Sequence, residues 1–240
     1  MELSVVIPVH NEQENLHGLI QEIDDCLSGQ LDYEIIVVDD GSSDGTPGAL
    51  QEMQPSFPGL RVIRHQVNCG QSAAIWTGVK SARAPWIATL DGDGQNDPAD
   101  ILRLYHLVTD SPEFQHVEAV MGHRRRRRDS AWKRLASRVA NSVRRRLMKD
   151  NDPDTGCGLK VFSKQKFLLL PYFDHMHRFL TALFEREGVQ VRSVAVRHRP
   201  RVKGVSHYGV GNRLWVGIVD LMGVLWLQRR NKRPVIDKED

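Results

Sequence analysis

The sequence predicts an α/β protein with a mostly parallel central sheet flanked by helices. Short runs rich in β-branched residues alternate with longer stretches of helical periodicity, which is typical of βαβ units. The chain has 240 residues, of which 40% are hydrophobic and 26% charged, so it can bury a substantial core and is neither disordered nor collagen-like. We expect one main domain over residues 1–210 and a C-terminal amphipathic extension over residues 211–240.

The expected strands come first in the chain and alternate with helices. They cover residues 3–9, 34–38, 61–65, 86–90 and 117–122. The first connecting helix should begin after Asn11, which can cap it, and Glu14 stands three residues on, as in a capping box. Its apolar positions keep helical spacing, namely Leu16, Leu19, Ile20, Ile23 and Leu27.

The second half of the chain follows another pattern. Residues 132–149 predict a basic helix with one apolar stripe, because their apolar side chains recur three or four positions apart. A polar loop, NDPDTGCG at residues 151–158, then precedes the apolar run LKVF. The segment RPRVKGVSHYGVGNR joins the body of the protein to an apolar stretch at residues 214–227.

The charge of the chain is concentrated in one segment. Residues 124–149 hold twelve Lys or Arg and one acid, so this segment carries +11 and the remainder −8, within a net charge of +3. Such a distribution predicts an anionic partner bound at one place. A solvated face and an RNA-binding patch are the alternatives, but Trp132 alone offers no stacking platform for RNA. A basic amphipathic helix suits an anionic membrane surface or a lipid phosphate better, and we expect no nucleic acid partner.

The N-terminus lacks the basic region of a signal peptide, and the three cysteines form no CxxC pair, so a cytoplasmic location is expected. The best apolar window, residues 214–227, is 14 residues long and contains Asp220, which is too short and too polar for a membrane span. Trp215 and Trp226 in this window, with basic residues after it, favour docking at a membrane interface. An ordinary core helix is the alternative.

Three polar clusters follow predicted strands: PVHNE, DDGSSDGT and DGDGQND. In open α/β sheets, ligands bind beyond the carboxyl ends of the strands, which is where these clusters should lie. Each could be a simple turn, because Asp, Gly, Asn and Ser dominate turns. Three such clusters at strand ends in one chain favour a binding site.

The cluster DGDGQND predicts a divalent-cation site. An EF-hand loop beginning at Asp91 would need glycine and glutamate where Asn96 and Leu102 stand, so that interpretation fails. A phosphatase-type aspartate nucleophile remains a weaker alternative, since Gln95 stands where that motif has Thr or Val. The remaining interpretation is a set of oxygen ligands, with Asp91, Asp93 and the amide oxygen of Gln95 on one side of an extended segment.

Taken together, these motifs resemble family 2 glycosyltransferases. The resemblance rests on SVVIPVHNEQENL, EIIVVDDGSSDGT, NCGQSAAIWTGVKSA, ATLDGDGQNDP, MGHRRRRRDSAWKRLASRVAN, DTGCGLKVF and RPRVKGVSHYG, and covers roughly residues 3 to 230. Within the family, the chain is most similar to the dolichol-phosphate mannose synthase and polyprenyl-phosphate glycosyltransferase group. The resemblance implies the GT-A nucleotide-diphospho-sugar transferase fold, with a Rossmann-like central sheet.

The resemblance also implies roles for individual residues. The nucleotide-sugar site would comprise Pro8, His10, Glu12, Val38, Asp40, Asp91 and Gly92, with Val38 and Asp40 at the base or ribose. The metal, Mg²⁺ or Mn²⁺, would be held by Asp91, Asp93 and Gln95. Catalytic positions would be Asp93, Asp154, Arg124 and Arg134, although a structural role for Asp154 stays open. The acceptor phosphate would contact Arg134, Arg201, Ser206 and His207, and His207 replaces the lysine usual in the family, which makes the charge of that contact depend on pH.

The activity implied is inverting, metal-dependent transfer of a sugar from a UDP- or GDP-sugar to a polyprenyl phosphate, dolichyl or undecaprenyl. The enzyme would associate peripherally with the cytoplasmic face of the membrane. One alternative is the same fold acting on a non-lipid glycan or small molecule. Another is a catalytically silent protein that senses nucleotide sugars or binds RNA, but the intact Asp91 and Asp93 argue against silence. The sugar, the base and the oligomeric state stay open.

Overall fold

The computed structural model describes residues 1–124, 148, 152–200 and 213–230. These residues form a seven-stranded sheet with the order β3-β2-β1-β4-β6-β5-β7. The strands are β1 (Leu3–Val9), β2 (Tyr33–Asp39), β3 (Leu60–Arg64), β4 (Trp86–Thr89), β5 (Val117–Arg124), β6 (Lys160–Ser163) and β7 (Gln190–Val196). Only β6 runs antiparallel, to both β4 and β5. The predicted mostly parallel sheet is therefore confirmed.

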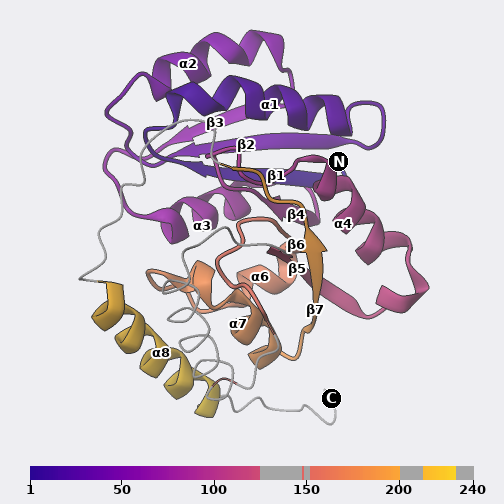
Figure 1. The fold of residues 1–240 in the computed structure, drawn as a ribbon, viewed down its shortest axis with the longest axis vertical. Helices are drawn as coiled ribbons and strands as arrows, with labels where there is room; N and C mark the ends of the chain where they lie inside the picture. Colours follow the sequence, from indigo (N-terminus) through magenta and orange to yellow (C-terminus); the bar gives the residue numbers. More distant parts are fainter. Residues whose placement is uncertain (125–147, 149–151, 201–212, 231–240) are drawn as a thin grey trace, which may run out of the picture.

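Helices cover both faces of this sheet (Figure 1). They are α1 (Gln13–Leu27), α2 (Thr46–Met53), α3 (Gln71–Ser81), α4 (Ala99–Asp110), α6 (Lys164–Leu168), α7 (Leu180–Arg186) and α8 (Arg213–Arg229), with short 3₁₀ turns η1 (Gln54–Ser56), η2 (Pro112–Phe114) and η3 (Met176–Arg178). One apolar core contains side chains of α1, α2 and α4, and a second contains side chains of α3, α7 and α8. The sheet separates the two cores.

Strand β1 shows how the sequence pattern produces these two cores. Its odd-numbered residues Leu3, Val5 and Ile7 belong to the core of α1, whereas Val6 belongs to the core of α3. Successive side chains of a strand point to opposite faces, so a continuous apolar run buries both sides. This is the pattern expected of a central parallel strand.

All five predicted strands are present, with boundaries within one or two residues. The sequence did not predict β7, because Gln190–Val196 mixes polar and apolar residues on an edge strand that is buried only at its end. Strand β6 begins within the apolar run LKVF. Its antiparallel direction was not expected.

The proposed capping box at α1 is wrong. Asn11 adopts a left-handed backbone conformation with a φ of 56°, and its side-chain oxygen accepts hydrogen bonds from the backbone N–H groups of Ser43 (2.8 Å) and Asp44 (3.3 Å). The helix begins at Gln13 without a side-chain cap. The Asn11 side chain binds the loop after β2 and is not available to cap α1. It thereby connects the loops that follow β1 and β2.

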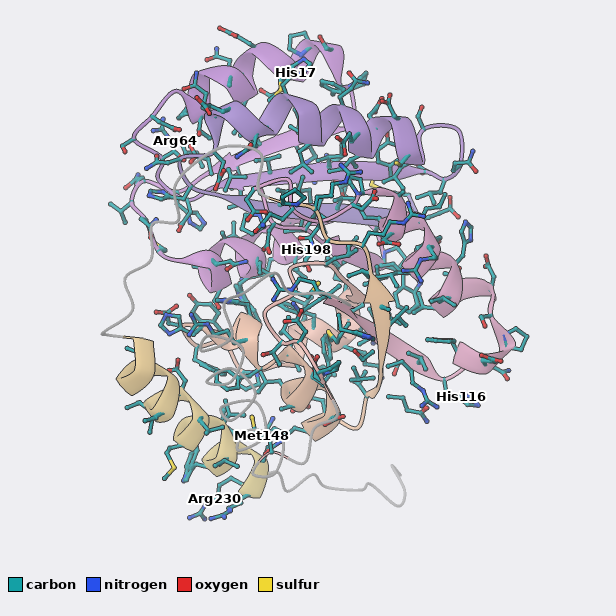
Figure 2. All side chains as sticks on the ribbon, in the orientation of Figure 1. His17, Arg64, His116, Met148, His198 and Arg230 are labelled. Atoms are coloured by element: carbon teal, nitrogen blue, oxygen red, sulfur yellow. The ribbon has the colours of Figure 1, made fainter. Side chains whose placement is uncertain are left out.

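Helix α8 packs on the body of the protein with one side only. Val224 is buried in the second core, and the carbonyl oxygen of Leu227 accepts a hydrogen bond from Nε of Arg186 at 3.1 Å. Met148 lies beside the C-terminal part of this helix, and its carbonyl oxygen accepts a bond from the side chain of Gln228 (Figure 2). The predicted basic helix at 132–149 otherwise lies outside the described residues, as do the side chains of residues 213–215, including Trp215.

The other side of α8 exposes apolar side chains. Exposed fractions are 42% for Ile218, 65% for Val219, 64% for Met222 and 59% for Trp226. One side of this helix therefore packs in the core, as the core-helix alternative expects, while the other is free in the described structure, so docking at a membrane stays a prediction. None of the helices described here has both the length and the apolar character needed to cross a membrane.

Candidate functional site

Two adjoining cavities lie beyond the carboxyl ends of β1 and β4. The larger has a volume of about 480 Å³ and the smaller of about 190 Å³. Pro8, Gln71 and Asp91 line both of them, so the cavities share one wall. This edge of an open α/β sheet is where ligands bind, and the predicted clusters PVHNE and DGDGQND both lie here.

The wall of the larger cavity is built around Asp40, which follows β2. The Asp40 carboxylate accepts hydrogen bonds from the backbone N–H groups of Cys69 (2.9 Å) and Gly70 (2.7 Å), and Nδ1 of His65 lies 2.7 Å from it. Asp40 is therefore held rigidly by the segment before α3. The carbonyl oxygen of Asp40 in turn lies 3.0 Å from Nδ1 of His10. Preorganised polar groups of this kind fix the orientation of a ligand.

Other residues predicted for the nucleotide meet the same cavity. Glu12 lines it, and the Glu12 carboxylate accepts a 2.6 Å hydrogen bond from the side chain of Asn15. Val38 differs, because its side chain is fully buried in the second core and is not part of the lining. Val38 lies in β2, two residues before Asp40, and its side chain packs in the second core instead of facing the cavity.

Asp91, Gly92, Asp93 and Gln95 form one rim of the larger cavity. Nε2 of Gln71 donates a 2.9 Å hydrogen bond to the Asp91 carboxylate, and the backbone N–H of Gln95 donates one to Asp93 at 3.1 Å. Gly92 is required by packing, since a Cβ there would lie 2.7 Å from Cγ1 of Val9. The loop is thereby pressed against the end of β1.

The two carboxylates of this rim, Asp91 and Asp93, lie close enough to repel each other. Burial, and then the negative charge of Asp93, raise the pKa of Asp91 from its ordinary 3.8 to about 6, although Lys160 and Arg124 act in the opposite direction. A pair of carboxylates and an amide oxygen is the ligand chemistry of hard cations such as Mg²⁺ and Mn²⁺. The residues present therefore fit the predicted metal.

Two further predicted residues, Arg124 and Asp154, form an ion pair. Arg124 ends β5 and donates from Nε (2.5 Å) and Nη2 (2.7 Å) to the two oxygens of the Asp154 carboxylate. Behind them, Asp152 accepts hydrogen bonds from the backbone N–H of Asp154 (2.9 Å) and from Thr181 (2.6 Å). A bidentate pair with a supporting carboxylate fixes the direction of the guanidinium group. Asp154 thus positions Arg124.

The smaller cavity brings in residues that the sequence did not assign. Lys160, His177 and Arg178 line it together with Asp91 and the loop 155–158. Lys160 could have been noticed in the sequence, because it is a charged residue within the apolar run LKVF. His177 and Arg178 stand in a short irregular segment, where no sequence pattern indicates a role. Gln71 could have been found as the first residue of the helix in the quoted motif NCGQSAAIWTGVKSA.

The remaining predicted positions lie outside the described residues. They are Arg134, Arg201, Ser206 and His207, all assigned to the phosphate side of the site. Among the described residues, the structure brings Pro8, His10, Glu12, Asp40, Asp91, Gly92, Asp93 and Gln95 to one cavity. Their individual functions stay predictions.

Comparison with known proteins gives a consistent result. The family model for glycosyl transferase family 2 matches residues 4–168. The dodecaprenyl-phosphate galacturonate synthase of Rhizobium johnstonii is 33% identical over 241 residues, which cover 98% of this chain and 69% of that protein. The undecaprenyl-phosphate 4-deoxy-4-formamido-L-arabinose transferase of Edwardsiella ictaluri is 34% identical over 211 residues, covering 87% of this chain and 63% of that protein. The chain therefore spans about two thirds of the length of these relatives.

Solved structures share the fold. Glucosyl-3-phosphoglycerate synthase from Mycobacterium tuberculosis, in complex with Mn²⁺, UDP-Glc and phosphoglyceric acid, matches with a TM-score of 0.64 and 19% identity over 95% of this chain and 79% of that one. A mannosyltransferase from Pyrobaculum calidifontis, in complex with GDP-Man and Mn²⁺, matches with a TM-score of 0.64 and 17% identity over 98% of this chain and 66% of that one. The expected GT-A fold is confirmed.

Proposed function

Because the chain belongs to glycosyl transferase family 2 and is a glycosyltransferase, we propose that it transfers a sugar from a nucleotide diphospho-sugar to a polyprenyl phosphate. The observation that carries this proposal is the pair of adjoining cavities with Asp91 in their shared wall. Relatives with 33% and 34% identity are named for dodecaprenyl- and undecaprenyl-phosphate products. The acceptor class is taken from these names.

The nucleotide binds in the larger cavity. Asp40 is fixed by two backbone N–H groups and His65, so its carboxylate can accept hydrogen bonds from a base or ribose without reorganising. The diphosphate then extends toward Asp91 and Asp93 on the rim. This order puts the anomeric carbon near the shared wall of the cavities.

Asp91, Asp93 and Gln95 would hold a Mg²⁺ or Mn²⁺ ion. When bound, such an ion neutralises the negative charge that develops on the departing diphosphate. Gln71 orients Asp91 through its 2.9 Å hydrogen bond, and the backbone N–H of Gln95 orients Asp93. These contacts hold the carboxylates toward the cavity before the donor arrives.

The acceptor needs orientation more than a general base. A phosphate monoester has a second pKa near 6, so its attacking oxygen is largely ionised at neutral pH. That oxygen forms a bond to the anomeric carbon as the bond to the diphosphate breaks, with inversion at carbon. Arg124 lines neither cavity, but Asp154 holds its guanidinium group beside the loop 155–158, from where it would attract the reacting phosphates. Arg134, Arg201, Ser206 and His207 would complete the acceptor side.

The enzyme works peripherally at the cytoplasmic face of the membrane. The exposed apolar side of α8, formed by Ile218, Val219, Met222 and Trp226, offers an interfacial surface, because apolar side chains and tryptophan insert at the headgroup boundary. The basic segment 124–149 adds attraction to anionic lipids. Such an arrangement delivers a lipid phosphate to a site on a protein that lies on the bilayer.

The test is release of nucleoside diphosphate from UDP- and GDP-sugars in Mn²⁺, measured with and without undecaprenyl phosphate. Release that depends on the lipid phosphate, and is lost in Asp93→Asn but retained in Asp25→Asn, supports the proposal. Asp25 is a matched control because it lies exposed on α1, away from both cavities. Release only with a phosphorylated small molecule would assign a non-lipid acceptor, and no release with any acceptor would indicate a silent protein.

A further inference from the structure

The smaller cavity is lined by positively charged side chains to which the proposed reaction assigns no role. Lys160 and Arg178 line it, and Asp91 is its acidic lining residue. His177, beside them, is neutral at physiological pH, because burial and then the charges of Lys160 and Arg178 lower its pKa to about 3. The wall therefore presents two cations against one carboxylate.

Lys160 is the most unusual of these groups, because its side chain is almost fully buried, with 6% of the residue exposed. Its ammonium group donates a hydrogen bond to the carbonyl oxygen of Cys157, and no carboxylate forms an ion pair with it among the described residues. A buried ammonium without a counter-ion is costly, so such groups are normally paired. Lys160 lies close enough to Asp91 to influence it, but that carboxylate is assigned to the cation.

Arg178 adds to the same wall. It ends η3, just before α7, and is partly buried, and it too forms no ion pair within the described part of the chain. A guanidinium group favours planar oxyanions, since it can donate two parallel hydrogen bonds. Lys160 and Arg178 thus form an incomplete site that a carboxylate from a ligand would complete.

The position of the cavity indicates which part of the ligand supplies that carboxylate. The larger cavity takes the nucleotide and diphosphate, and the smaller one continues from it across Asp91. The sugar follows the diphosphate in the donor, so it enters the smaller cavity. We propose that this cavity binds the donor's sugar ring and that Lys160 and Arg178 select a sugar bearing a carboxylate, a hexuronic acid. This inference rests on the proposed function and deepens it.

The experiment compares donors that differ only at this group. UDP-galacturonate and UDP-glucuronate are compared with UDP-galactose and UDP-glucose, and GDP-mannuronate with GDP-mannose, by calorimetric titration in Mn²⁺. Charge-assisted hydrogen bonds predict that the wild type binds the uronic donor roughly ten- to a hundredfold more tightly. Lys160→Met removes the ammonium group and keeps an unbranched side chain one atom shorter, so it should bring the ratio of uronic to neutral donor affinity toward one. Lys80→Met, on the exposed side of α3, is the matched control and should retain it.

Because Lys160 is buried, Lys160→Met could disturb folding, so a second variant tests the same inference at Arg178. Arg178→Gln, in the partly buried position, should also lower the ratio, with the melting temperature measured for each protein. Equal binding of uronic and neutral donors by the wild type, or an equal loss of both in the two variants, overturns the inference. An unchanged ratio with a raised KM for undecaprenyl phosphate would show that the cavity takes the acceptor phosphate, which also overturns it.

The two proposals fail separately. If the enzyme transfers neutral sugars to undecaprenyl phosphate as efficiently as uronic acids, the proposed function stands and the selection of a carboxylate is wrong. If no nucleotide sugar of either kind binds, both are wrong. Uronic transfer that falls selectively in Lys160→Met supports both.

Discussion

Replacing Asp91 by asparagine removes a titrating carboxyl group and keeps an oxygen that can accept the hydrogen bond from Gln71. Burial, followed by the charge of Asp93, raises the pKa of Asp91 to about 6 from 3.8. Between these values the folded protein binds more protons than the unfolded chain, so wild-type stability falls as pH rises from about 4 to 6. The pKa difference of about 2 units corresponds to a loss of about 3 kcal/mol in the free energy of unfolding above pH 6. This is an upper limit, because Asp91 is only partly buried and water screens its charge.

Asparagine does not titrate, so Asp91→Asn should be more stable than the wild type at pH 7 in EDTA. The difference in free energy of unfolding between the variant and the wild type should increase by about 1 kcal/mol from pH 5 to pH 7. Urea unfolding followed by tryptophan fluorescence measures it, with Asp25→Asn as a matched control that should show no such widening. Added Mn²⁺ should stabilise the wild type more than the variant at pH 7, because the ion binds the ionised carboxylate of the folded state. The reasoning would be refuted by a stability difference between variant and wild type that is the same at both pH values, or by a variant less stable than the wild type at pH 7 in EDTA.

Three other predictions follow from the contacts of the site. Asp154→Asn should lower transfer by about tenfold or more, because Arg124 loses its bidentate partner; conservation of full kcat and KM would show that the ion pair does not position Arg124. Gly158→Ala should weaken Mn²⁺ binding in calorimetric titration, since the new Cβ would lie 2.2 Å from the Asp91 carboxylate, and unaltered affinity would contradict this. Trp226→Ser should reduce flotation with anionic liposomes without a large change in melting temperature, because this side chain is 59% exposed; a large drop in melting temperature would instead assign it to the core.

The sequence predicted the parts of the site that depend on neighbouring residues. Alternation of short β-rich runs with helical stretches gave five strands and the mostly parallel sheet, because these periodicities are local. Polar clusters directly after β1, β2 and β4 were expected at one edge, since the carboxyl ends of parallel strands lie together. Local reasoning failed at Asn11, whose side chain is taken by the distant residues Ser43 and Asp44.

Only the tertiary structure decided what completes the site. Strand β6 is inserted antiparallel between β4 and β5, with Lys160 opposite Thr89, so the beginning of β6 meets the carboxyl end of β4. This direction brings Lys160 and the loop before it beside Asp91, about 70 residues earlier in the chain, as the pocket lining shows. Periodicity reports which side of a strand is buried, and it carries no information on strand order or direction. The sequence by itself therefore determined the fold class and the acidic rim, whereas sheet order determined which cations face that rim.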